Sequence, residues 1–120
     1  MATLLVVEDD DLQRRMLGLL LSKHFGVTLC DQFSASEYDW CSFDAILLDV
    51  IMPVLDGPSL VRQAAGRCEI MPVVVFYSAM PSDLLQREVG ALSGVGPVYY
   101  ICKAGSPSIL IETLLALCAS

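Results

Sequence analysis

Short apolar runs alternate with amphipathic stretches along the whole chain. Five runs have the length of a strand and carry so few polar residues that both faces of each strand are apolar. These runs cover residues 3–7, 27–30, 45–49, 72–77 and 98–102. Strands of this kind are typical of a parallel sheet that helices cover on both sides.

Helical patterns separate the runs. The first helix is expected to start at Asp11 and to reach about His24. Its inward stripe is predicted to consist of Leu12, Met16, Leu19, Leu20 and Phe25. A short, weak helix is predicted over residues 35–41, and longer ones over 57–65, 81–92 and 107–118. Ser106 followed by Pro107 is a typical cap and first-turn pair for the last of these.

Regular alternation of strand and helix predicts a single α/β domain over residues 1–120. Right-handed crossovers between parallel strands lead to an open, doubly wound (βα)5 fold. The common strand order at this size is 2-1-3-4-5, as in flavodoxin-like proteins.

Composition and charge exclude several classes of protein. Apolar residues make up 55% of the chain, yet no apolar run reaches the ~18–20 residues that span a bilayer, and the first residues do not resemble a signal peptide. A net charge of −7 argues against a nucleic-acid surface. The five cysteines are scattered and form no C-x-x-C motif. We therefore expect a cytoplasmic protein that contacts neither membrane nor nucleic acid and has no disulfide and no zinc site.

Residues whose side chains can bind a metal or take part in a reaction follow the ends of the predicted strands. Glu8 and Asp9 follow the first strand, Asp49 ends the third, Ser78 follows the fourth and Lys103 the fifth. In a 2-1-3-4-5 sheet the first and third strands are neighbours at the switch point, so these side chains converge at the carboxyl edge. Carboxylates that crowd together repel one another and need a cation, which predicts a divalent-metal site.

Single residues of this set also have ordinary structural explanations. Acids after a strand often begin a helix, and Asp10 is interpreted in this way. Asp56 and Gly57 are interpreted as turn residues, and Ser78 is a possible cap for the helix after Pro81. These explanations leave the convergence of the whole set unaccounted for, which favours a functional site.

Four segments make the chain resemble the receiver domain of two-component response regulators over essentially its full length. Residues 4–10, LLVVEDD, resemble the acidic opening of that family. Residues 47–57, LLDVIMPVLDG, resemble its phosphoacceptor strand and loop, which is the most specific motif. YSA at 77–79 resembles the pair of a hydroxyl and a small residue, and YICK at 100–103 resembles the aromatic residue and lysine near the end.

The resemblance implies that Asp49 accepts a phosphoryl group from a histidine kinase or a phosphotransfer protein, with Mg²⁺ as cofactor. Asp9 and Asp49 would bind the metal directly, the Ile51 main-chain carbonyl would add a ligand, and Glu8 would act through water. Lys103 would bridge Asp49 and the transferred phosphoryl oxygens.

The resemblance also implies a switch rather than an enzyme. Ser78, with Ala79 beside it, would be drawn toward the phosphoryl group, and Tyr100 would rotate inward. Of the adjacent Tyr99 and Tyr100, one should pack inward and the other outward. The face formed by helix 81–92, strand 98–102 and the last helix would then change for partner binding or dimerisation.

Three departures from the family pattern stand out. Ala104 follows Lys103 where the family has a cis proline, which predicts either a trans bond with a rebuilt loop or a strained cis bond. Ser78 and Lys103 are 25 positions apart, about three more than the resemblance implies, and we place the excess in residues 93–97. Ile51 and Met80 are apolar and should hinder an attacking water, which predicts slow self-dephosphorylation.

The last helix has more apolar residues than a helix packed on a sheet requires. The excess favours a dimer face, contact with a following effector domain, or unusually deep burial, and the chain is interpreted as the possible N-terminal module of a longer regulator. Three other functions share parts of this pattern: a receiver that acts without phosphorylation, a flavodoxin and a Mg²⁺-dependent phosphohydrolase. The acids after the first strand would repel a flavin phosphate, and the phosphohydrolase needs an aspartate where Ile51 stands.

Overall fold

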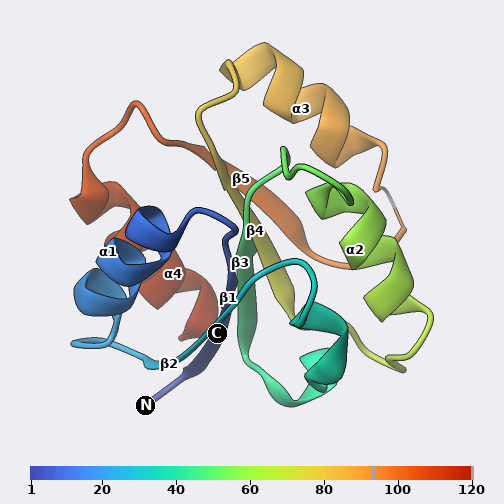
Figure 1. The fold of residues 1–120 in the computed structure, drawn as a ribbon, viewed down its shortest axis with the longest axis horizontal. Helices are drawn as coiled ribbons and strands as arrows, with labels where there is room; N and C mark the ends of the chain where they lie inside the picture. The colour runs from blue at the N-terminus through green and yellow to red at the C-terminus, as the bar shows by residue number, and fades with distance from the viewer. Residues whose placement is uncertain (93, 120) are drawn as a thin grey trace.

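The computed structural model describes residues 1–92 and 94–119 and contains a five-stranded parallel sheet (Figure 1). The strands are β1 (Thr3–Val7), β2 (Gly26–Cys30), β3 (Ala45–Leu48), β4 (Val73–Ser78) and β5 (Val98–Cys102). They lie in the order β2-β1-β3-β4-β5. The predicted fold class and strand order are confirmed, and each strand boundary agrees with the prediction to within one residue.

The α-helices are α1 (Asp11–Leu21), α2 (Gly57–Ala65), α3 (Ser82–Gly90) and α4 (Pro107–Cys118). Helices α1 and α4 cover one side of the sheet, and α2 and α3 cover the other (Figure 1). Alternate strand residues supply the two cores: Leu5, Val7, Ile46 and Phe76 pack on the α2 side, and Leu4, Val6, Leu47 and Val75 on the α1 side. All these residues are buried, as the apolar strands predict.

The predicted helix over residues 35–41 is wrong. Two 3-10 turns, η1 (Ala35–Glu37) and η2 (Trp40–Ser42), form the connection between β2 and β3. Tyr38, between them, has an extended backbone, and the Asp39 side chain accepts a hydrogen bond from Cys41 N. Aspartate competes in this way with continued helical hydrogen bonding, so the described chain has four α-helices rather than five.

Helix α1 presents a different face to the sheet from the one predicted. Leu12, Met16 and Leu19 are exposed at 67%, 60% and 73%, whereas Leu17 and Leu21 are buried. Residues 16–21 are apolar on nearly every side, so periodicity does not select a buried face. The helix also ends at Leu21 rather than near His24, although Phe25 is buried as predicted.

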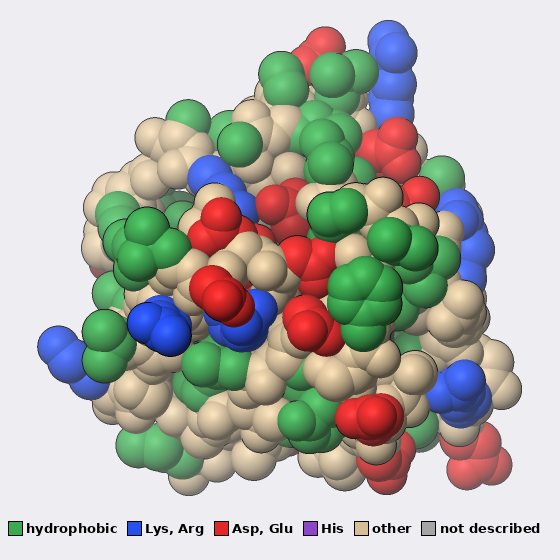
Figure 2. All heavy atoms as spheres, in the orientation of Figure 1, with side chains coloured by type: hydrophobic (Ala, Val, Ile, Leu, Met, Phe, Trp, Pro, Cys, Tyr) green, Lys and Arg blue, Asp and Glu red, His purple; other side chains and the backbone are tan. Residues whose placement is uncertain are grey.

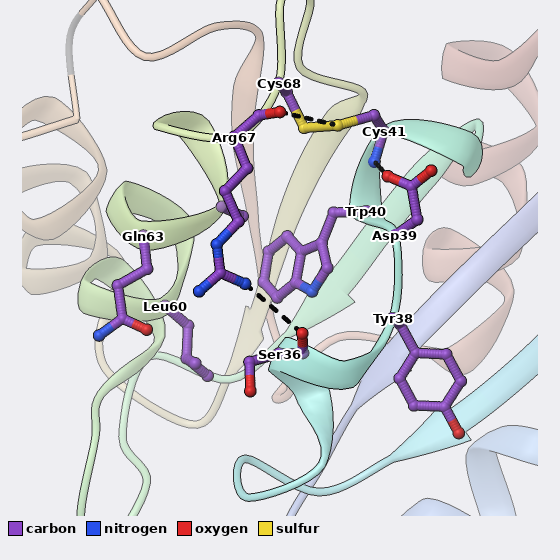
Figure 3. Close-up of a pocket in the computed structure, with 10 residues that line it drawn as sticks. Ser36, Tyr38, Asp39, Trp40, Cys41, Leu60, Gln63, Arg67 and Cys68 are labelled. Atoms are coloured by element: carbon purple, nitrogen blue, oxygen red, sulfur yellow. Dashed lines mark hydrogen bonds between the residues drawn. A yellow bond between two sulfur atoms is a disulfide. The ribbon is translucent and has the colours of Figure 1, made fainter.

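A disulfide joins Cys41 to Cys68 (Figure 3), so the prediction of a chain without disulfides is wrong. The bond ties η2 to the turn that follows α2. Figure 3 shows the Trp40 ring pointing toward the α2 side, where it lines a small cavity of about 80 Å³ with Leu60. The Trp40 indole donates to Ala35 O at 2.9 Å. The two cysteines are 27 positions apart, so only the tertiary fold brings them together.

The last helix is capped as predicted, since the Ser106 side chain accepts from Ser108 N. Leu110 and Leu114 are buried, while Ile109 and Leu115 are exposed. The extra loop positions assigned to 93–97 begin at Ser93, which lies outside the described residues. Within the described ranges, no helix is both long enough and apolar enough to cross a membrane.

Candidate functional site

The carboxyl ends of the parallel strands deliver charged side chains to one edge of the sheet. Val7 pairs with Leu48, so the residues that follow them, Glu8 and Asp49, leave neighbouring strands side by side. At the other end of the edge, Lys103 N donates to Ser78 O at 2.8 Å, because β4 and β5 are adjacent. Figure 2 shows acidic side chains gathered between the α1 and α2 regions, with basic and hydrophobic side chains beside them.

The Lys103 amine lies at the centre of the site. Its Nζ donates to Asp49 Oδ2 at 3.0 Å and to Gln13 Oε1 at 2.7 Å, and it lies 3.6 Å from Glu8 Oε2. It also lies 5.5 Å from the centre of the Tyr77 ring. The side chains of Lys103, Asp49 and Glu8 are 17%, 15% and 9% exposed, so their charges interact with little screening from water.

The Lys103–Ala104 bond is trans, one of the two geometries that the sequence left open. Gly105 N donates to Cys102 O at 3.2 Å and closes a turn after the strand. With this trans bond, Lys103 Nζ still reaches Asp49 Oδ2, so a cis proline after the lysine is not needed for the contact.

Burial raises the pKa of the Glu8 carboxyl above its ordinary value. The Lys103 charge and a hydrogen bond from Asp10 N oppose this rise, whereas the nearby Asp49 charge adds to it. Burial is therefore the largest influence on the pKa of this carboxyl. Arg14 donates to Glu8 O at 2.9 Å and so supports the main chain here rather than the carboxylate.

Asp9 does not share the lysine. Its Oδ1 accepts from Gln32 N at 2.8 Å, and its Oδ2 accepts from the Gln32 side-chain amide. Gln32 was not among the predicted site residues, and no motif in the sequence marks it. Asp10 is a helix-start acid, as predicted: its side chain caps α1 by accepting from Gln13 N at 2.9 Å.

The loop after β3 is packed closely around Asp49. Asp49 Oδ1 accepts from Ile51 N at 3.2 Å, and Gly57 N donates to Val50 O at 2.9 Å. A Cβ atom on Gly57 would lie 2.1 Å from Asp49 O, so only glycine fits there. Asp56 caps α2 by accepting from Ser59 N, which agrees with its interpretation as a turn residue.

The predicted switch residues have mixed surroundings. Ser78 is buried, and its Oγ accepts from Met80 N at 3.3 Å. It does not cap α3, whose N-cap is Pro81. Tyr99 and Tyr100 are exposed at 44% and 37%, so the expectation that one of them packs inward is wrong for this structure. Both lie on β5, an edge strand with no neighbour on one side.

An apolar groove of about 570 Å³ borders the site along α1. Met16, Leu19 and Leu20 of α1 line it together with Tyr77 and Lys103. The exposed α1 face therefore adjoins the lysine that contacts Asp49.

Sequence comparisons identify the family, although no family model matches the chain. FixJ, a transcriptional regulatory protein of Bradyrhizobium diazoefficiens, is 32% identical over 72% of the chain. The response regulator MprA of Mycobacterium tuberculosis is 30% identical over 95% of it. The fold matches the chemotaxis protein CheY4 of Vibrio cholerae with a TM-score of 0.81 and 24% identity over 98% of both chains.

The chain is a response-regulator receiver domain. Receiver domains are signalling modules rather than catalytic enzymes, and they typically bind Mg²⁺. The domain spans 45% of FixJ and 49% of MprA, less than half of each relative. Among its described residues, no three His, Cys, Asp or Glu side chains form a ready-made set of metal ligands.

Proposed function

We propose that this receiver domain accepts a phosphoryl group on Asp49 from a histidine kinase or a histidine phosphotransfer protein. The observation that carries the proposal is the 3.0 Å contact between Lys103 Nζ and Asp49 Oδ2 beside the buried Glu8. An ion pair between a lysine and a solvent-exposed aspartate is common on protein surfaces and would not indicate a functional site. Here the Lys103 amine, which follows β5, is shared between two carboxylates, Glu8 after β1 and Asp49 after β3, at one partly buried point.

In the proposed reaction, an Asp49 carboxylate oxygen attacks the phosphorus of a phosphohistidine. The P–O bond forms as the P–N bond breaks, and the leaving imidazole keeps the electron pair and takes a proton from solvent. The nucleophile is a carboxylate, which carries no proton to remove, so the step needs no general base. It needs alignment and charge compensation, and Lys103 supplies a positive charge to the oxygens that arrive.

The donor set fits Mg²⁺. Glu8 and Asp49 share the Lys103 amine, and Asp9 is hydrogen-bonded to the neutral Gln32, so two of the three negative charges remain for a divalent cation to balance. Mg²⁺ prefers few carboxylates with several waters. Asp9 and Asp49 would bind it directly, with the Ile51 carbonyl, and Glu8 would act through water. When bound, the ion would neutralise charge on the phosphoryl oxygens.

The proposed output is a change on the face formed by α3, β5 and α4. Ser78 Oγ would leave Met80 N for a phosphoryl oxygen, with Ala79 N as a neighbouring donor. Tyr100, which is solvent-exposed here, would then turn inward. This change would alter binding to an effector domain, a downstream protein or a second copy through α4, where Ile109 and Leu115 are exposed.

The proposal also covers partners, domain context and location. The apolar face of α1 next to Lys103 supports docking of the phosphodonor at this end of the domain.

The length of the relatives supports residues 1–120 as one module of a longer regulator. We retain the cytoplasm as the proposed location, and the Cys41–Cys68 disulfide is the observation against it, since disulfides are rare there.

The test is incubation with acetyl phosphate and Mg²⁺, followed by intact-mass measurement. Wild type should gain the mass of one phosphoryl group, and Asp49→Asn should gain none. Asp83→Asn, which removes an exposed carboxylate on α3, is the matched control and should behave as wild type. No gain in wild type would instead favour a receiver that acts without phosphorylation.

The lifetime of the phosphorylated form tests the predicted slow self-dephosphorylation. Once acetyl phosphate is removed, the mass gain should persist, because apolar Ile51 and Met80 hinder an attacking water. Ile51→Ser should shorten the lifetime. Loss of the phosphoryl group from wild type within minutes, without a partner, would contradict the prediction.

A further inference from the structure

Gln32 is a buried polar residue that joins two separate parts of the site. It follows β2 and is only 5% exposed. Its main-chain N donates to Asp9 Oδ1 at 2.8 Å, and its side-chain Nε2 donates to Asp9 Oδ2. Its Oε1 accepts from Leu55 N at 2.6 Å. One side chain therefore connects the acidic end of β1 with the loop that follows Asp49.

The orientation of the Gln32 amide follows from its neighbours. Leu55 N–H is a donor and requires an oxygen opposite it, whereas the Asp9 carboxylate requires a donor. Only one assignment of the amide satisfies both partners. Together, the main-chain and side-chain N–H groups of Gln32 hold both oxygens of Asp9, which fixes the plane of the carboxylate.

We propose that Gln32 is a positioning residue that holds Asp9 for the cation and couples cation binding to the loop 50–56. The inference rests on the proposed function of this site. Each carboxylate oxygen has two lone pairs, and Gln32 uses one on each, so the other remains free for a metal. Hydrogen-bond partners of metal ligands commonly set the orientation of those ligands.

The connection to Leu55 extends this role to the phosphoacceptor loop. The loop carries Ile51, whose carbonyl is the proposed main-chain ligand, and it ends at Gly57 against Asp49. A cation on Asp9 would reduce the negative charge that Gln32 Nε2 contacts. This would change the polarisation of the amide and, through Gln32 Oε1, the strength of the hydrogen bond from Leu55 N. Gln32 is thus the direct link between two sources of ligands on different strands.

The experiment compares Mn²⁺ affinity, measured by electron paramagnetic resonance of the free ion, in three proteins. Gln32→Met keeps the length of the side chain and removes its polar atoms, and Gln86→Met makes the same change at an exposed site on α3. We expect Gln32→Met to weaken Mn²⁺ binding about 10–100-fold, as for other residues that orient metal ligands. Gln86→Met should bind as wild type.

A second measurement needs no variant. In ¹⁵N-labelled wild type, the Gln32 side-chain amide and Leu55 N–H resonances should shift when Mg²⁺ is added, and this holds even if Gln32→Met fails to fold. The role of Gln32 is overturned if a folded Gln32→Met protein binds Mn²⁺ with unchanged affinity, or if the two resonances do not move in wild type that binds Mn²⁺. Either result leaves the proposed function intact. Absence of Mn²⁺ binding by wild type overturns the proposed function as well.

Discussion

Reduction of the Cys41–Cys68 disulfide should destabilise the domain substantially without unfolding it. The bond closes a loop of 27 positions between η2 and the turn after α2. The chain-entropy estimate for a loop of this length is about 3.5 kcal/mol at 25 °C. A domain of this size should then lose roughly 10–15 °C in melting temperature. The fold should survive, because both hydrophobic cores, including Trp40, remain packed.

The assay is urea denaturation of the air-oxidised protein with and without reductant, beside a Cys41→Ser, Cys68→Ser double variant. The double variant should match the reduced wild type and should not respond to reductant. Thiol titration of the oxidised protein should find free thiols only at Cys30, Cys102 and Cys118. Five titratable thiols, or equal denaturation midpoints in the two wild-type samples, would refute the reasoning.

Three further predictions follow from burial and packing. The pKa of Glu8 is raised in the folded state, so the protonated carboxyl favours folding below its unfolded pKa and this contribution is lost as pH rises through its folded pKa. In urea denaturation, Glu8→Gln should therefore be more stable than wild type at pH 7 and should lose that advantage at pH 4. Gly57→Ala places a Cβ against Asp49 O and should lower the free energy of unfolding by about 3 kcal/mol. Gly90→Ala, where a Cβ meets nothing within 4 Å, should be neutral or slightly stabilising, and equal effects of the two substitutions would contradict the close packing at Gly57. Leu17→Ala should cost about 3 kcal/mol and Leu19→Ala less than about 0.5 kcal/mol, and the reverse order would mean that α1 packs through its predicted face.

Much of the fold and of the candidate site was predictable because it depends on local patterns. Strands that are apolar on both faces, such as Ala45–Leu48, belong in a parallel sheet whatever covers them. Parallel strands share their carboxyl edge, so the meeting of Asp49 with Glu8 and Lys103 follows from strand order alone. Caps such as Ser106 act within one turn of their own helix and were therefore predictable.

Apart from the helix predicted over 35–41, where the local hydrogen bond of Asp39 decided the outcome, the main errors and omissions concern contacts between segments that are distant in the chain. Residues 16–21 are apolar on almost every side of the helix, so only docking on the sheet decided that Leu17 faces inward and Leu19 outward. Cys41 and Cys68 meet because η2 and the end of α2 are neighbours in space, which no spacing rule encodes. Gln32 reaches both Asp9 and Leu55 across 23 positions in each direction.

The amino-acid sequence by itself determined the sheet, its order and the acids and amine at its carboxyl edge, because hydrophobic periodicity and right-handed crossovers act on every such chain. Tertiary structure alone decided which face of α1 meets solvent, which cysteines pair and which amide holds Asp9. These outcomes depend on the relative positions of packed elements, and many arrangements of side chains are compatible with the same local pattern until the elements dock.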